Sequence, residues 1–149
     1  MSKIVLKTII KSDIQTVFDL SRDIDLHQKS TSKTNEKAVA GRTSGLIEQG
    51  ETVTWKAKHL GVIQILITKI IVMNKPHHFT DVMLKGTFKS MKHQHIFRQE
   101  GKNTIMTDIF EFESPAGIIG KLFNYFFLKN YMTKFLTERN KLIKLTAEK

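Results

Sequence analysis

Six consecutive segments with the pattern of β-strands follow one another along the chain, and they constrain the fold more than any other feature. They span residues 37–42, 51–60, 62–73, 79–86, 91–100 and 103–113. Short links that contain turn residues separate them, such as Gly61, Asn74-Lys75-Pro76 and Gly101. Links this short join antiparallel neighbours, because parallel strands need a long crossover. The pattern therefore predicts one antiparallel sheet.

A further strand and two short helices are expected before this sheet. Residues 3–11 alternate loosely between apolar and polar side chains, which predicts a strand. Ser12 and Gln15 then have the spacing of a capping box, which predicts the start of a short helix. Residues 24–26 indicate a second short helix, whereas residues 27–36 contain no apolar side chain and predict a loop.

After Ser114-Pro115 the pattern becomes helical up to the end of the sequence. Apolar residues recur at three- and four-residue steps, namely Leu122, Phe126, Phe135, Leu136, Leu142 and Ile143. A single sheet must cover its apolar face, and one long helix is available to cover it. We therefore predict an α+β fold over residues 1–149 as one domain. A curved antiparallel sheet of about seven strands would wrap around a long C-terminal helix, with two short helices after the first strand.

Composition excludes several kinds of site. The chain has no cysteine, which excludes disulfides, thiolate nucleophiles and cysteine-ligated zinc. Three lysines interrupt residues 1–11, so we expect no signal peptide there. Gln64 and Lys69 break the longest apolar run before it reaches the roughly 18 residues that a membrane span needs. These features favour a cytoplasmic protein.

The chain is basic, with 24 Lys and Arg against 14 Asp and Glu, a net charge of +10. The charge is spread evenly, because residues 1–75 and residues 76–149 each carry 12 basic and 7 acidic side chains. No basic tail or block is present, and one tryptophan and two tyrosines are few for stacking on bases. We therefore expect no specific nucleic-acid partner.

Two histidines share one face of the strand predicted at residues 91–100. Within it, Lys92 and Arg98 belong to one alternating set, which we assign to solvent. The other set contains His93, His95 and Phe97, and these side chains should point inward.

A two-residue turn at Gly101-Lys102 would set the register of this strand against the next one. It places Phe97 opposite Met106, His95 opposite Asp108, and His93 opposite Phe110. Opposed Cβ atoms lie about 5 Å apart, so an imidazole and a carboxylate can form a hydrogen bond across the strands. Because an unpaired buried charge is costly, we predict that His95 is the partner of Asp108.

The strand predicted at residues 51–60 supplies further inward side chains. Its threonines and lysines form the solvent-exposed set, so Trp55 and His59 should point inward and line the same cavity. The pattern does not distinguish the two faces of the strand that contains Asp81.

The order of elements resembles the helix-grip fold of the START-like, or SRPBCC, superfamily, which includes the birch pollen allergen, lipid-transfer domains and polyketide cyclases. Particular stretches resemble a bacterial branch described as ligand-binding SRPBCC or cell-division-inhibitor-like proteins. These stretches are Gly45-Leu46-Ile47 to Gly50-Glu51, Val53-Thr54-Trp55 to His59-Leu60-Gly61, Phe79 with Asp81, Gly86-Thr87-Phe88, His93 to Phe97, Thr104 through Asp108 to Phe112, Pro115 with Gly117, and Arg139-Asn140. The resemblance implies an internal cavity and no particular reaction.

The inward His and Asp side chains have three interpretations. They can be a satisfied polar pair that fixes strand register, or groups that orient a ligand in a mostly apolar pocket. Thirdly, His95 and Asp108 can act as an acid–base pair, or His93 and His95 can bind a metal with Asp108 or His59. The superfamily that the chain resembles mostly binds organic ligands without metal. We therefore assign no cofactor, no metal ligand and no catalytic residue.

The terminal helix has no acidic side chain between residues 116 and 137, and it combines aromatic residues with lysines. A helix on a membrane surface has such a composition, but so does a helix that a sheet surrounds. We assign most of it to the core. Across residues 118–128 the apolar arc is wider than one sheet covers, which predicts a cavity gate that also contacts a membrane or an apolar partner. The gate residues would be Ile118, Ile119, Phe123 and Phe127.

We predict a protein, monomeric or weakly dimeric, that binds or carries a hydrophobic small molecule or lipid between the sheet and the terminal helix. The apolar walls are assigned to Trp55, Phe97, Met106, Phe110, Leu122 and Phe126, and the polar end of the ligand to His59, His93, His95 and Asp108. One alternative is a small cyclase- or hydrolase-like enzyme, acid–base or metal-assisted, that uses the same His and Asp side chains. The other is a membrane- or protein-interaction module that works through the terminal helix.

Overall fold

Seven antiparallel strands form a single sheet in the computed structural model, which describes residues 1–59, 61–114 and 127–149. The strands are β1 (Ser2–Ile10), β2 (Lys37–Gly41), β3 (Thr52–His59), β4 (Val62–Asn74), β5 (His78–Lys85), β6 (Ser90–Glu100) and β7 (Asn103–Glu113). Their order across the sheet is β1-β7-β6-β5-β4-β3-β2, so consecutive strands from β2 to β7 are neighbours. The predicted strands and their antiparallel pairing are confirmed.

The β6–β7 hairpin has the predicted register. It pairs His93 with Phe110, His95 with Asp108 and Phe97 with Met106. Gly101 begins the turn with a φ of 61°, a left-handed value that glycine adopts without a Cβ clash. The turn chemistry therefore decides which inward side chains of β6 and β7 face one another.

Two short helices, α1 (Ile14–Ser21) and α2 (Ile24–Ser30), follow β1, and a 3-10 turn, η1 (Ser32–Thr34), follows α2. The predicted capping box is wrong. The carboxylate of Asp13 caps α1 instead, because it accepts hydrogen bonds from the backbone N and the Oγ1 of Thr16, at 3.0 Å and 2.7 Å. The loop predicted at residues 27–36 is partly wrong, since α2 continues to Ser30.

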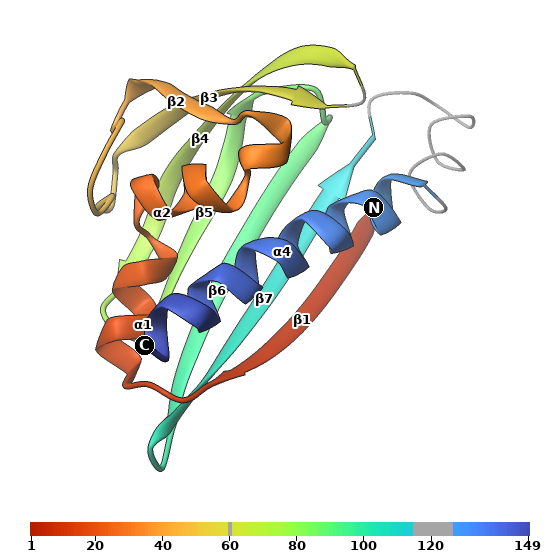
Figure 1. Cartoon of the computed structure of the whole chain (residues 1–149). Coiled ribbons are helices and arrows are strands. Elements are labelled where there is room, and N and C mark those ends of the chain that lie inside the picture. Colours follow the sequence, from red (N-terminus) through yellow and green to blue (C-terminus); the bar gives the residue numbers. More distant parts are fainter. Residues whose placement is uncertain (60, 115–126) are drawn as a thin grey trace.

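One long helix, α4 (Lys129–Ala147), lies across the sheet, with α1 and α2 beside its C-terminal half (Figure 1). Its buried side chains include Met132, Leu136 and Ile143, which belong to the apolar core. The sheet curves around this helix, so the predicted α+β helix-grip architecture is confirmed.

Irregular pairing bends the part of the sheet farthest from β1. Register shifts occur in β2 between Ala38 and Ala40, and in the pairing of β4 with β5 after Ile67 and after Ile70. An extra residue bends its strand and increases the local twist. These bends curl β2 and β3 towards α2 (Figure 1). A cavity lies between this part of the sheet and the helices.

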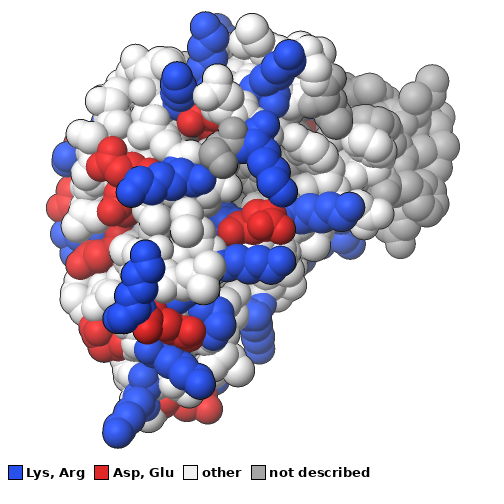
Figure 2. All heavy atoms as spheres, viewed as in Figure 1, with Lys and Arg blue, Asp and Glu red and all other residues white. Residues whose placement is uncertain are grey.

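Positive and negative side chains are interspersed on the face of the molecule shown in Figure 2, without one large patch of Lys and Arg. This agrees with the even distribution of charge along the sequence. Within the described ranges, no helix is both long enough and apolar enough to cross a membrane.

Candidate functional site

A cavity of about 470 Å³ lies between the sheet, α4 and the α1–α2 pair. Strand alternation brings apolar side chains to its wall from β3, β4, β5 and β7, and α4 closes it from the other side. The described apolar wall includes Val53, Trp55, Ile70, Phe79, Phe110 and Leu136. Small-molecule sites are hollows of about 300–1,000 Å³ with mostly apolar walls. The cavity therefore has the size and the composition for one organic molecule.

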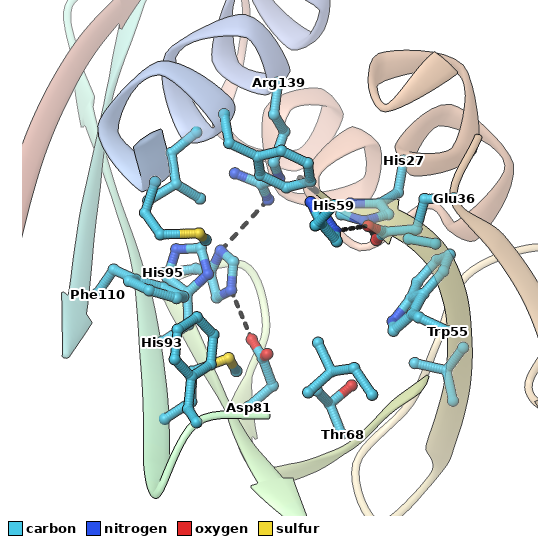
Figure 3. Close-up of a pocket in the computed structure, with 18 of the residues that line it drawn as sticks. His27, Glu36, Trp55, His59, Thr68, Asp81, His93, His95, Phe110 and Arg139 are labelled. Carbon is cyan, nitrogen blue, oxygen red and sulfur yellow. Dashed lines mark hydrogen bonds and ion pairs between the residues drawn. The ribbon is translucent and has the colours of Figure 1, made fainter. Parts of the chain in front are cut away.

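A polar cluster forms one side of this cavity and extends behind its wall (Figure 3). We call it the central cluster, and it consists of Asp81 on β5, His93 and His95 on β6, Asp108 on β7, and Arg139 and Asn140 on α4. Asp108 is fully buried. Its Oδ1 lies 2.8 Å from Nε2 of His93 and 3.3 Å from a guanidinium nitrogen of Arg139. Its Oδ2 accepts a 2.8 Å hydrogen bond from Nδ2 of Asn140.

The two histidines of β6 have different partners from those predicted. His95 donates from Nε2 to Oδ1 of Asp81 at 2.7 Å, whereas Asp108 pairs with His93. The predicted His95–Asp108 hydrogen bond is wrong, because Nδ1 of His95 stays 3.6 Å from the Asp108 carboxylate. Each histidine binds the carboxylate two positions along from its directly opposite residue. Strand side chains lean along the strand, so these diagonal neighbours come within reach.

Burial and neighbouring charges fix the protonation of this cluster. Burial, together with the electrostatic effect of His93, lowers the pKa of His95 to about 4, so its ring is neutral at pH 7. The neutral ring donates to Asp81 and accepts at Nδ1 from Arg139, at 3.4 Å. Burial raises the pKa of Asp81, but the hydrogen bond from His95 and the electrostatic effects of His95, His93 and Arg139 together outweigh burial and lower the pKa. Burial likewise opposes ionisation of Asp108, yet its hydrogen bond with His93 and the charge of Arg139 hold its pKa well below the usual range.

A second polar group lines another side of the cavity (Figure 3). We call it the bridging cluster, and it consists of His27, Glu36, His59 and Tyr131. The Glu36 carboxylate lies 2.7 Å from Nε2 of His27 and 3.6 Å from Nε2 of His59. Nδ1 of His59 lies 2.7 Å from the hydroxyl of Tyr131. Burial raises the pKa of Glu36, but its hydrogen bonds with the two histidines lower it more, to about 2.

Half of the predicted ligand contacts line the cavity, namely Trp55, His59, His93, His95 and Phe110. Phe97 and Met106 lie in the core behind the wall, because α1 covers that end of the sheet. There Phe97 packs against Phe18, and the sulfur of Met106 accepts a hydrogen bond from the hydroxyl of Ser21. Asp108 is also behind the wall, enclosed by its partners.

Two predicted contacts, Leu122 and Phe126, lie outside the described residues, as do the predicted gate residues Ile118, Ile119 and Phe123. Phe127, the remaining gate residue, is 46% exposed. The next residue, Leu128, lines the cavity.

Sequence reasoning missed several polar residues of the described cavity wall, among them His27, Glu36, Thr68, Asp81, Tyr131 and Arg139. His27 and Glu36 lie in a stretch without apolar periodicity, and Asp81 in a strand whose faces looked alike. Arg139 was named in the sequence analysis only as part of the stretches that resemble SRPBCC proteins. The one available signal was that Glu36 is the sole acidic residue among residues 27–36.

Asp81, His93 and His95 each place one potential ligand atom within 4.8 Å of the others, which raises the question of a metal. The two imidazole rings lie against each other, with centroids 3.7 Å apart. Nε2 of His93 faces the carboxylate of Asp108 and Nε2 of His95 faces that of Asp81, so both nitrogens already have hydrogen-bond partners. The Arg139 guanidinium, 3.4 Å from His95, also opposes a second cation. The geometry favours a hydrogen-bond network over a metal centre.

Solved structures share this fold at low sequence identity. No protein-family model and no curated protein sequence matches the chain. A protein from Thermus thermophilus superposes with a TM-score of 0.76 at 15% identity, over 99% of this chain and 100% of that one. A START superfamily protein from Mycobacterium smegmatis gives 0.74 at 11% identity, over 98% and 97% of the two chains. Major latex-like protein 151 from Panax ginseng gives 0.70 at 19% identity, over 98% and 97%. The chain therefore has the START-like, or SRPBCC, helix-grip fold.

Proposed function

We propose that the protein binds or carries a hydrophobic small molecule or lipid in the cavity and holds its polar end against the wall. The main observation that supports this proposal is the cavity of about 470 Å³, whose lining is mostly apolar and includes a few polar side chains. The START-like fold supports it, since the sequence also resembles a superfamily that includes lipid-transfer domains.

An enzyme using the His and Asp side chains has weaker geometric support. A general base needs a free lone pair within reach of the substrate. Both ring nitrogens of His95 are engaged, by Asp81 and by Arg139. Both oxygens of Asp108 are engaged as well, and this carboxylate does not reach the cavity. His95 and Asp108 therefore use their hydrogen-bonding atoms on other protein groups rather than on a substrate. For this reason we propose ligand binding and not catalysis.

The cytoplasmic location, the monomeric or weakly dimeric state, the lack of a specific nucleic-acid partner and the membrane contact through residues 118–128 all stay predictions from the sequence.

Fluorescence of Trp55 tests the proposal directly, because it is the only tryptophan of the sequence and it lines the cavity. The probe is N-phenyl-1-naphthylamine, an uncharged apolar dye that accepts energy from tryptophan. We expect saturable quenching with one dye per chain. A native mass spectrum of the freshly purified protein would show in parallel whether an organic molecule co-purifies. Quenching that rises linearly without saturation, in a protein free of any co-purified molecule, would refute the proposal.

A further inference from the structure

Three polar groups on the cavity floor have no hydrogen-bond partner within the part of the chain that the structure describes. They are the indole N–H of Trp55, the hydroxyl of Thr68 and the Oδ2 of Asp81, whose Oδ1 holds His95. All three are largely buried: Trp55 is 7% exposed, Thr68 6%, and the side chain of Asp81 16%. Buried polar groups normally have partners, so three open ones at a single hollow indicate a place for something else to bind.

These groups form a row across three neighbouring strands. Trp55 lies on β3 opposite Leu66, and Asp81 lies on β5 opposite Ile70. Thr68 stands on β4 midway between Leu66 and Ile70, on the same face. In Figure 3, Thr68 accordingly lies between Asp81 and Trp55 along the floor. The row offers a donor at one end, a hydroxyl in the middle and a carboxylate acceptor at the other end.

The cations of the wall are already used by other protein groups. Arg139 donates to Asp108, Asn140, the carbonyl of Ser21 and Nδ1 of His95. Arg22 donates to Asp19, Glu48 and the carbonyl of Ile47. Neither guanidinium is therefore available to neutralise an anionic ligand. By contrast, Oδ2 of the Asp81 carboxylate faces the cavity without a hydrogen-bond partner among the described residues.

We propose that the row Trp55–Thr68–Asp81 binds the polar end of the ligand, and that this end carries a hydroxyl group rather than a carboxylate or phosphate. A hydroxyl placed between Thr68 and Asp81 donates one hydrogen bond to Asp81 and accepts another from Thr68, so a single group satisfies these two neighbouring members of the row. An anionic end meets the Asp81 carboxylate in a buried site, where repulsion between like charges is strong. This inference rests on the proposed function and specifies the ligand class for the same cavity.

Two ligands of equal chain length test it: 1-decanol and decanoate, each displacing N-phenyl-1-naphthylamine at pH 7.5. We expect decanol to bind more tightly to the wild type, partly because it is uncharged. The decisive quantity is therefore the change in the decanol-to-decanoate affinity ratio in Asp81→Asn. The amide still accepts from His95 but does not repel an anion, so the ratio should fall by about ten-fold. Dye affinity should stay within about two-fold of the wild type.

Two further variants complete the design. Glu100→Gln makes the same charge change at a side chain 63% exposed on the β6–β7 hairpin, and it should leave the ratio unchanged. Thr68→Val removes only the hydroxyl at nearly constant volume, so it should weaken decanol by about five-fold and spare the dye. If Asp81→Asn does not fold, the decanol affinity of Thr68→Val still tests whether the row binds the polar end of the ligand.

The outcomes separate the two proposals. Failure of the wild type to bind the dye saturably would overturn the proposed function, and this inference with it. Saturable dye binding with an unchanged ratio in Asp81→Asn and unchanged decanol affinity in Thr68→Val would overturn this inference alone. A wild type that prefers decanoate would overturn it too.

Discussion

At the scale of single residues, Asp108 shows how one buried charge connects several elements. Its carboxylate has no solvent exposure and accepts hydrogen bonds from β6 and from α4. A charge buried this deeply is tolerated only when it is fully paired. Its partners His93, Arg139 and Asn140 therefore fasten α4 to the sheet. This explains why a residue predicted to contact the ligand lies behind the cavity wall instead.

The neutral state of His95 predicts a pH dependence of folding stability. Its pKa falls from 6.5 to about 4 on folding, so between these values the unfolded chain binds a proton that the native chain does not. Stability must therefore decrease as the pH falls from 6.5 towards 4. The contribution from this residue is about 2 kcal/mol between pH 7.5 and pH 5.

Urea unfolding at pH 7.5, 6, 5 and 4.5 checks this expectation in the wild type and in His95→Gln. The variant should be less stable at pH 7.5, but its stability should decrease less steeply between pH 6.5 and pH 4. His77→Gln, which removes an exposed histidine, should keep the wild-type slope. Equal slopes in all three proteins would contradict the assigned protonation state.

At the scale of secondary-structure elements, the bridging cluster joins three parts of the chain that the sequence separates widely. His27 belongs to α2, His59 to β3 and Tyr131 to α4, while Glu36 precedes β2. The carboxylate of Glu36 is 7% exposed and lies between the two histidines. The ring of His27 also packs against Trp55, with centroids 4.4 Å apart. One carboxylate thus holds α2 against the strand that supplies the cavity floor.

Replacing Glu36 with Gln should release this connection. A neutral amide keeps one acceptor oxygen and loses the charge that pairs with both histidines, so we expect a loss of stability of about 2–3 kcal/mol. Hydrogen exchange in α2 should accelerate more than exchange in β6 and β7. Glu138→Gln, at a surface pair with Lys141 in which Glu138 is 53% exposed, should change stability by less than about 1 kcal/mol. A similar loss in both variants would show that Glu36 has no special role.

At the scale of the whole molecule, surface and interior differ in charge. The chain has a net charge of +10, which by itself favours anionic partners. Inside the cavity the arginines are paired and Asp81 is open, so the interior favours a hydrogen-bond donor. The net charge of a chain is therefore a poor guide to the ligand of an internal cavity.

Filling the cavity should abolish binding without removing any of its polar groups. Ala57 lines the cavity on β3, between Trp55 and His59, and Ala57→Phe places a phenyl ring inside it. We expect this variant to fold and to lose the quenching by N-phenyl-1-naphthylamine. It should also lose the stabilisation of about 2.7 kcal/mol that a ligand gives at one hundred times its Kd.

Ala40→Phe makes the same substitution at an exposed position of β2 and should bind the dye as the wild type does. Undiminished binding by Ala57→Phe would place the dye at another site and contradict the proposed location.

The sequence by itself determined the strands, their antiparallel order, the register of β6 on β7 and the covering helix. These follow from local rules: alternation assigns the faces of a strand, a two-residue turn fixes which residues are opposite, and a sheet must bury its apolar face. Trp55, His59, His93, His95 and Phe110 were placed at the cavity by the same rules.

Only the tertiary structure decided which polar groups meet. His95 binds Asp81 and His93 binds Asp108, because side chains lean along curved strands and reach diagonal neighbours. Glu36 and Arg139 reach the cavity because the chain folds back on itself and brings distant segments into contact. Sequence spacing describes positions along one strand or helix. Hydrogen bonds in a buried cluster depend instead on directions and distances between different elements. Those distances are set only when the sheet curves around α4.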